Sequence, residues 1–174
     1  AIAQLYFYEG FNLIKIFDVE NFLFTPILLG LLFGAFYALI TIPILKKEIF
    51  KSIPLPLNDV IKNLHLNLFD ILFLSICAGI GEELLFRTGI QYYFGITLTS
   101  LFFVAIHGYY SFKIPKKSLY GLIVTPFILL LSFGFEYFGL WFAIVAHFAY
   151  DLVLFISYVY FQEDEILPHV ENKI

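Results

Sequence analysis

The sequence predicts an all-α integral membrane protein, a bundle of about five transmembrane helices around a polar cavity inside the bilayer. The first observation is composition: 61% of the 174 residues are hydrophobic and only 14% are charged, whereas globular domains have about 25% charged residues. A soluble domain of this length could not bury so much apolar surface. The second observation is that the apolar residues form runs of the ~20 residues that a helix needs to cross a hydrocarbon core of ~30 Å.

The length corresponds to one membrane domain, residues 1–174, in which we distinguish three parts. Residues 1–20 are apolar but interrupted by charges, and we expect an interfacial helix or the stub of a longer chain. Residues 21–161 form the transmembrane core, and residues 162–174 form an acidic tail. Within the core, low charge marks five helices. Their expected ranges are residues 22–45, 66–90, 94–112, 118–135 and 139–161.

The loops between these helices predict the orientation. Lysines are concentrated in the loops 46–65 and 112–118, which lie on one side if all five helices cross. By the positive-inside rule this side is the cytoplasm, so the C-terminus is also cytoplasmic. Tyrosines near the helix ends, Tyr109 among them, fit an interfacial belt. The bias toward Phe, Ile, Tyr and Lys favours a bacterial source, with the cell membrane as the location.

Composition also excludes several classes of protein. The net charge is −4, so no basic surface indicates a nucleic-acid partner. The single cysteine, Cys77, cannot form a disulfide within the chain. The lipid bilayer is therefore the partner that composition predicts.

A GxxxG motif lies in the first expected helix. It consists of Gly30 and Gly34, and such a motif lets two helix backbones approach closely. It predicts close packing either within the chain or in a dimer, and the oligomeric state stays open.

Ionisable residues inside the expected helices are the candidate functional residues. A charge at the centre of a transmembrane helix costs about 2.5–3.5 kcal/mol on insertion scales, so such residues face a cavity or the bundle interior and indicate function. The small residues of the segment 78–81 would let water or a neighbouring helix come close to the acids that follow. The candidates are Glu82, Glu83 and Arg87 in the second helix, His107 in the third, and His147 and Asp151 in the fifth.

Helical spacing divides these residues by role. Glu83 and Arg87 are four residues apart, so they share a helix face and are expected to form a structural ion pair. Glu82 lies about 100° further round the helix, where Arg87 does not neutralise it as easily, and it is the acid left free for chemistry. His147 and Asp151 again lie one turn apart.

Straight helices of the expected lengths would not bring all these residues together. They would leave His107 about 10 Å from Glu82 and His147 along the bilayer normal. One helix must therefore be tilted, shifted or re-entrant if the residues form one site. The glycines at positions 89, 95 and 108 offer places for such a change.

Three short motifs occur in order, each in its own expected helix. Residues 82–87 (EELLFR) fit the pattern EExxxR, residues 103–107 (FVAIH) fit FxxxH, and residues 147–151 (HFAYD) fit HxxxN/D. In these motifs the sequence resembles the CPBP family of intramembrane proteases, the CAAX-protease and bacteriocin-processing group that is also called Abi. The resemblance covers roughly residues 66–155.

This resemblance implies an intramembrane endopeptidase. Characterised eukaryotic members of the family remove the last three residues from prenylated CAAX proteins, so the implied partner is a peptide or prenylated protein substrate in the membrane. The resemblance further implies that Glu82 and His107 activate a water, and that His147 and Asp151 stabilise the oxyanion. Some bacterial members are linked to bacteriocin maturation or self-immunity.

The residues are compatible with two mechanisms. Peptide hydrolysis needs a base for the water and hydrogen-bond donors for the oxyanion, which a glutamate and a histidine provide without a cofactor. Alternatively, Glu82, His107 and His147 are acceptable zinc ligands in kind, and the protein would be an intramembrane metalloprotease. The sequence has no HExxH motif and no cysteine pair, which favours the metal-free mechanism.

Two other functions compete with the endopeptidase. A non-catalytic member of the same family would use the cavity for binding, as a bacteriocin-immunity protein or a membrane scaffold. A proton or ion translocator would use Glu82, His107, His147 and Asp151 as a relay. No repeat or pair of broken helices marks a transport path, so the sequence favours the endopeptidase over the translocator.

Overall fold

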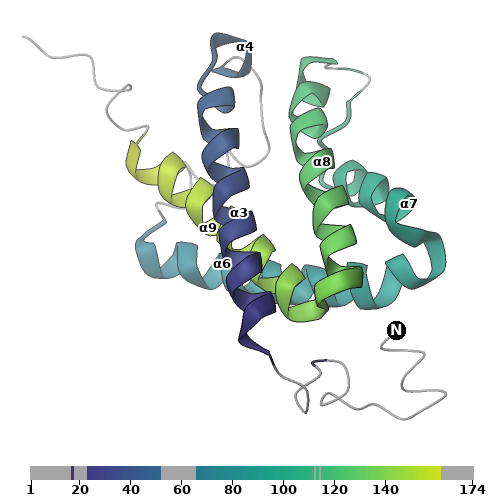
Figure 1. The fold of residues 1–174 in the computed structure, drawn as a ribbon. Helices are drawn as coiled ribbons and strands as arrows, with labels where there is room; N and C mark the ends of the chain where they lie inside the picture. The colour runs from purple at the N-terminus through teal and green to yellow at the C-terminus, as the bar shows by residue number, and fades with distance from the viewer. Residues whose placement is uncertain (1–16, 18–22, 52–65, 112, 114, 162–174) are drawn as a thin grey trace, which may run out of the picture.

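The computed structural model describes residues 17, 23–51, 66–111, 113 and 115–161. All regular elements in these residues are helices (Figure 1), so the all-α class is confirmed. The N-terminal segment expected from the sequence, apart from Phe17, and the acidic tail lie outside the described residues. The elements are α3 (Phe24–Leu45), α4 (Glu48–Lys51), α6 (Leu68–Leu85), the π-helix η3 (Phe86–Ile90), α7 (Gln91–Ile106), α8 (Pro115–Phe138) and α9 (Leu140–Phe161).

The long helices lie close to the ranges that hydropathy predicts. Helices α3, α8 and α9 match the first, fourth and fifth ranges within a few residues, and α6 together with η3 fills the second. Within the described residues, two stretches are long and apolar enough to cross a membrane, Phe24–Leu45 and Lys117–Tyr160. The second stretch covers most of α8 and α9, which Gly139 separates with a φ of 78°. These stretches support a membrane protein, whereas five crossings stay a prediction.

The third helix differs from the expected range of 94–112. Gly95 has a φ of 70° and a ψ of 176°, which interrupt α7 near its start. A φ of this sign is open to glycine and strained for residues with a side chain. The helical part beyond Gly95 ends at Ile106, so at 1.5 Å per residue it rises only about 16 Å.

Helix α6 has a strongly defined start. The Asn67 side chain accepts hydrogen bonds from the backbone N–H groups of Phe69 and Asp70, at 2.8 and 3.1 Å. The Asp70 carboxylate in turn accepts from the Asn67 backbone N–H at 3.0 Å, which completes a capping box. The capping box defines the residue at which α6 begins. Helix α6 lies across the direction of α3 and α8 (Figure 1).

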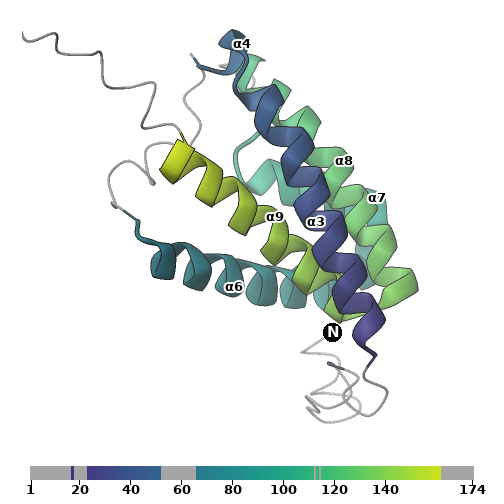
Figure 2. The same cartoon turned by 60° about the vertical axis from the view of Figure 1, so that its left-hand side comes forward.

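Helix α9 lies between α3 and α6 (Figure 2), and glycines bring the three backbones together. A Cβ atom added at Gly30 would lie 2.5 Å from the Phe142 carbonyl oxygen, and one at Gly34 would lie 2.0 Å from that of Ala146. From the other side, a Cβ at Gly79 would lie 2.8 Å from the Ile144 carbonyl oxygen. The GxxxG motif therefore packs within the chain.

Gly34→Ala is expected to lower the free energy of unfolding by about 3 kcal/mol, because the added methyl group meets the α9 backbone, which cannot move aside as a side chain can. Gly81→Ala is the matched control, since a Cβ at Gly81 would have no atom within 4 Å. We expect its melting temperature to be unchanged or slightly raised. Thermal unfolding followed by gel filtration in detergent measures both, and equal melting temperatures for the two variants would contradict the packing of α3 on α9.

Candidate active site

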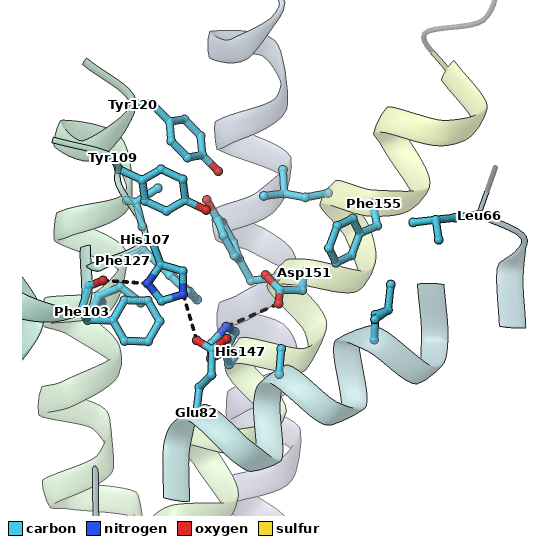
Figure 3. Close-up of a pocket in the computed structure, with 16 residues that line it drawn as sticks. Leu66, Glu82, Phe103, His107, Tyr109, Tyr120, Phe127, His147, Asp151 and Phe155 are labelled. Atoms are coloured by element: carbon cyan, nitrogen blue, oxygen red, sulfur yellow. Dashed lines mark hydrogen bonds and ion pairs between the residues drawn. The ribbon is translucent and has the colours of Figure 1, made fainter. Parts of the chain in front are cut away.

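Glu82, His107, His147 and Asp151 line one pocket of about 280 Å³. Glu82 projects from α6, His107 directly follows α7, and the other two project from α9 (Figure 3). The structure thus brings together all four residues that the resemblance marks as catalytic. The remaining walls are mainly aromatic and aliphatic, and include Phe103, Val124, Phe127, Ile128, Leu154 and Phe155.

Glu82 and His107 face each other. Glu82 Oε2 lies 3.3 Å from His107 Nε2, and both side chains are partly exposed, by 31% and 27%. His107 Nδ1 lies 2.7 Å from the Phe103 carbonyl oxygen. Because a carbonyl only accepts, Nδ1 carries the proton, and Nε2 of the neutral ring is an acceptor. Both atoms can therefore accept, and a water molecule on the pocket side of the pair could donate one proton to each.

Aromatic stacking and the end of α7 hold the His107 ring in place. The ring stacks on Phe103, with centroids 4.4 Å apart, and on Tyr109, with centroids 5.7 Å apart. Gly108 has a φ of 69°, and it donates its N–H to the Ala105 carbonyl while Tyr109 donates to that of Val104. These bonds form a Schellman motif, in which glycine takes the left-handed position. The motif returns Tyr109 over the imidazole.

The separation of about 10 Å expected for straight helices does not occur. His107 and Glu82 are in contact for two reasons that the structure makes visible. Helix α6 crosses the bundle at a steep angle (Figure 2), and the break at Gly95 redirects the chain between α6 and the rest of α7. Of the three glycines singled out in the sequence, Gly95 and Gly108 have a positive φ, and Gly89 lies within the π-helix η3.

Glu83 is fully buried and links two elements. Its Oε2 atom accepts from Arg87 Nε at 2.7 Å, which is the ion pair that the spacing predicts. Its Oε1 atom lies 2.7 Å from His147 Nδ1. The sequence did not reveal this second contact, because the two residues are 64 positions apart and nothing local relates them.

Arg87 is held by further polar side chains. Its Nη1 group donates to Gln91 Oε1 at 2.8 Å and to the hydroxyl of Ser132 on α8. Gln91 Nε2 donates to Glu136 Oε1 at 2.7 Å. Gln91 continues the four-residue spacing of Glu83 and Arg87, so the sequence did contain a signal for it. It held none for Ser132. Arg87 lies in η3, and π-helical turns are frequent at functional sites.

Both ring nitrogens of His147 face carboxylates. Nδ1 is bonded to Glu83, and Nε2 lies 3.4 Å from Asp151 Oδ2. The zinc alternative needs one of these nitrogens as a third ligand beside Glu82 and His107. In the described part of the chain, no cluster of three or more His, Cys, Asp or Glu side chains is arranged to hold a metal ion. A zinc ion at Glu82 and His107 would require His147 Nε2 to turn from Asp151.

Comparison with known proteins agrees with the motifs. A family model described as type II CAAX prenyl endopeptidase Rce1-like matches residues 64–153, a range that includes all six candidate residues. The chain is also similar to the "Uncharacterized protein YpbD" of Bacillus subtilis (strain 168), with 33% identity over 106 residues. The match covers 59% of this chain, and the chain spans about half (54%) of that relative's length. No solved structure matches the chain.

Proposed function

The chain belongs to the type II CAAX prenyl endopeptidase Rce1-like family, and we propose that it is an intramembrane endopeptidase that hydrolyses a peptide bond of a membrane-associated or lipidated, CAAX-like substrate. Members of this family are proteases. The family match and the apolar stretches together indicate a membrane protein. Residence in the cell membrane, five crossings and a cytoplasmic C-terminus are part of the proposal.

One observation carries this proposal, the opposed acceptors of Glu82 and His107 at 3.3 Å. A water beside this pair that donates a proton to each atom directs an oxygen lone pair away from both, toward the pocket. When that oxygen attacks a carbonyl carbon, Glu82 accepts a proton from the water as general base. The proton then passes to the leaving nitrogen as the tetrahedral intermediate collapses. His107 orients the water, because its other nitrogen is tied to Phe103.

The pocket walls support an apolar substrate segment. Aromatic and branched aliphatic side chains surround the polar end formed by the four candidate residues. Pockets of this kind bind apolar groups, while a few polar groups fix the orientation. This favours a peptide bond that lies next to hydrophobic side chains or a lipid chain.

Purified protein reconstituted in liposomes tests the proposal directly. It is incubated with a quenched fluorescent peptide that carries an S-farnesyl cysteine near its C-terminus, and with the same peptide without the lipid. We expect cleavage at a single bond, faster for the lipidated peptide. If neither peptide is cleaved while both bind, a non-catalytic binding role replaces the proposed function.

Chelators are expected to leave the peptidase activity unchanged. The reason is that His147, the third ligand in the zinc alternative, directs both ring nitrogens to carboxylates. The measurement is the initial cleavage rate before and after dialysis against EDTA and 1,10-phenanthroline. Loss of activity together with one zinc per chain by elemental analysis, and its return on adding zinc, would establish the metalloprotease mechanism instead.

A further inference from the structure

The hydrolysis proposed above needs a hydrogen-bond donor for the oxyanion, and this inference rests on that proposed function. By resemblance, His147 and Asp151 would supply the donor. An ionised Asp151 carboxylate only accepts hydrogen bonds. His147 shares Nδ1 with Glu83 at 2.7 Å and turns Nε2 toward Asp151 at a looser 3.4 Å. Both ring nitrogens thus face carboxylates, and the donor must come from elsewhere in the pocket.

Three tyrosines line the same pocket: Tyr109, Tyr120 and Tyr150. A phenol hydroxyl is a hydrogen-bond donor, as is the side-chain amide of the asparagine that the HxxxN/D pattern allows at position 151. Figure 3 shows the hydroxyl of Tyr109 on the Asp151 side of the pocket, above His107. Tyr109 reaches this place because the Schellman motif at Gly108 turns it back over the imidazole.

Tyr150 carries the second observation. The residue is only 4% exposed. Its buried hydroxyl lies near the Thr41 side chain but has no partner at hydrogen-bond distance among the described residues. Its ring is fixed by stacking on Phe127, with centroids 4.0 Å apart. A buried hydroxyl without a partner destabilises the folded state, so phenylalanine would suit this position better for packing alone. A donor kept at such a cost beside a pocket indicates a role toward a ligand.

We propose that the hydroxyls of Tyr109 and Tyr150 donate hydrogen bonds to the oxyanion of the tetrahedral intermediate. The water oxygen bonds to the carbonyl carbon, the π electrons move to the carbonyl oxygen, and Glu82 takes one water proton. Both phenols keep their protons and donate to the negative oxygen. The C=O bond then re-forms, the C–N bond breaks, and the proton on Glu82 goes to the leaving nitrogen.

Single Tyr→Phe variants provide the first test. Tyr150→Phe and Tyr109→Phe are each expected to lower kcat about 100-fold, as the loss of one oxyanion donor does, with little change in KM. Tyr150→Phe should also melt at the same temperature as the wild type or higher. The matched control is Tyr37→Phe: the Tyr37 hydroxyl donates to the Ile123 carbonyl at 3.1 Å, so its loss should lower the melting temperature and leave kcat unchanged.

Asp151→Asn distinguishes an oxyanion donor from a structural role. The new amide supplies a donor in the same pocket, so in this background each Tyr→Phe change should lower kcat less than about 10-fold. A merely structural role of the tyrosines would give the same loss in both backgrounds. Equal losses, or an unchanged kcat in both single variants, overturn the proposal.

Binding of a transition-state mimic decides the matter even if no peptide is cleaved. The probe is a fluorescent lipidated peptide in which a tetrahedral phosphinate replaces the scissile amide. We expect Tyr109→Phe and Tyr150→Phe to weaken phosphinate binding at least 10-fold, while binding of the parent peptide stays the same. Failure of the wild type to cleave any peptide rejects the proposed function. The tyrosine donors are rejected if wild type and variants bind the phosphinate with equal affinity, or if the wild type binds neither the phosphinate nor the parent peptide.

Discussion

Glu82→Gln is expected to leave a folded protein whose kcat is lower by about 10³-fold or more, the range lost with a general base. The amide has nearly the shape of the carboxylate, but it cannot accept the proton of the attacking water. The fold should persist because the Glu82 side chain is 31% exposed at the pocket. Initial cleavage rates and gel filtration of the same preparation measure the two effects.

Glu83→Gln is the matched control, the same chemical change one residue further along α6. Glu83 is fully buried and bonded to both Arg87 and His147, so its loss should mainly reduce the amount of folded protein. If Glu82→Gln keeps its activity, Glu82 is not the base. Equal melting temperatures for the two variants would contradict the division into a catalytic and a structural acid.

Arg87→Ala is expected to lower the free energy of unfolding by about 3–5 kcal/mol, the loss found when one partner of a buried ion pair is removed. Arg87 is 1% exposed, and it connects η3 to α8 through Ser132. Its removal leaves Glu83 without its cationic partner on α6–η3 and leaves Gln91 without one of its contacts. The midpoint of thermal unfolding, followed by gel filtration in detergent, measures the loss.

The double variant Glu83→Gln with Arg87→Gln provides the control for this effect. It replaces two opposite charges by neutral groups that can still hydrogen-bond, so no buried charge is left unpaired between positions 83 and 87. Its loss of stability should be smaller than the sum of the losses of Glu83→Gln and Arg87→Gln measured singly, which is how contacting residues behave. Strict additivity would show that the pair is not coupled in the folded protein.

The positions of the helices follow from local properties of the sequence. Runs of apolar residues and their flanking charges predict α3, α8 and α9. The hydropathy of a membrane helix is a local property of its own residues, so it can be read without knowing which helices are its neighbours. The ion pair of Glu83 and Arg87 is equally local, since it depends only on the four-residue repeat of the helix. Packing of Gly30 and Gly34 was predicted, but the motif alone does not reveal α9 as the partner.

The assembly of the site depends on the angles between helices, and the hydropathy of the sequence does not predict these angles. Glu82 and His107 meet because α6 lies across the bundle and Gly95 interrupts α7, whereas straight parallel helices would hold them apart. Tyr109 fitted an interfacial belt by its place near a helix end. The turn at Gly108 instead stacks it on His107 and makes it part of the pocket wall.

Cleavage in water enriched in ¹⁸O tests the proposed mechanism most directly, because the attacking oxygen should come from a water that Glu82 activates. A farnesylated peptide is incubated with reconstituted wild type or Glu82→Gln, and the masses of the products are measured by mass spectrometry. We predict one internal cleavage with one ¹⁸O in the new carboxylate for the wild type, and no product above background for the variant. Intact peptide with the wild type, or equal labelled product with both proteins, would contradict the account.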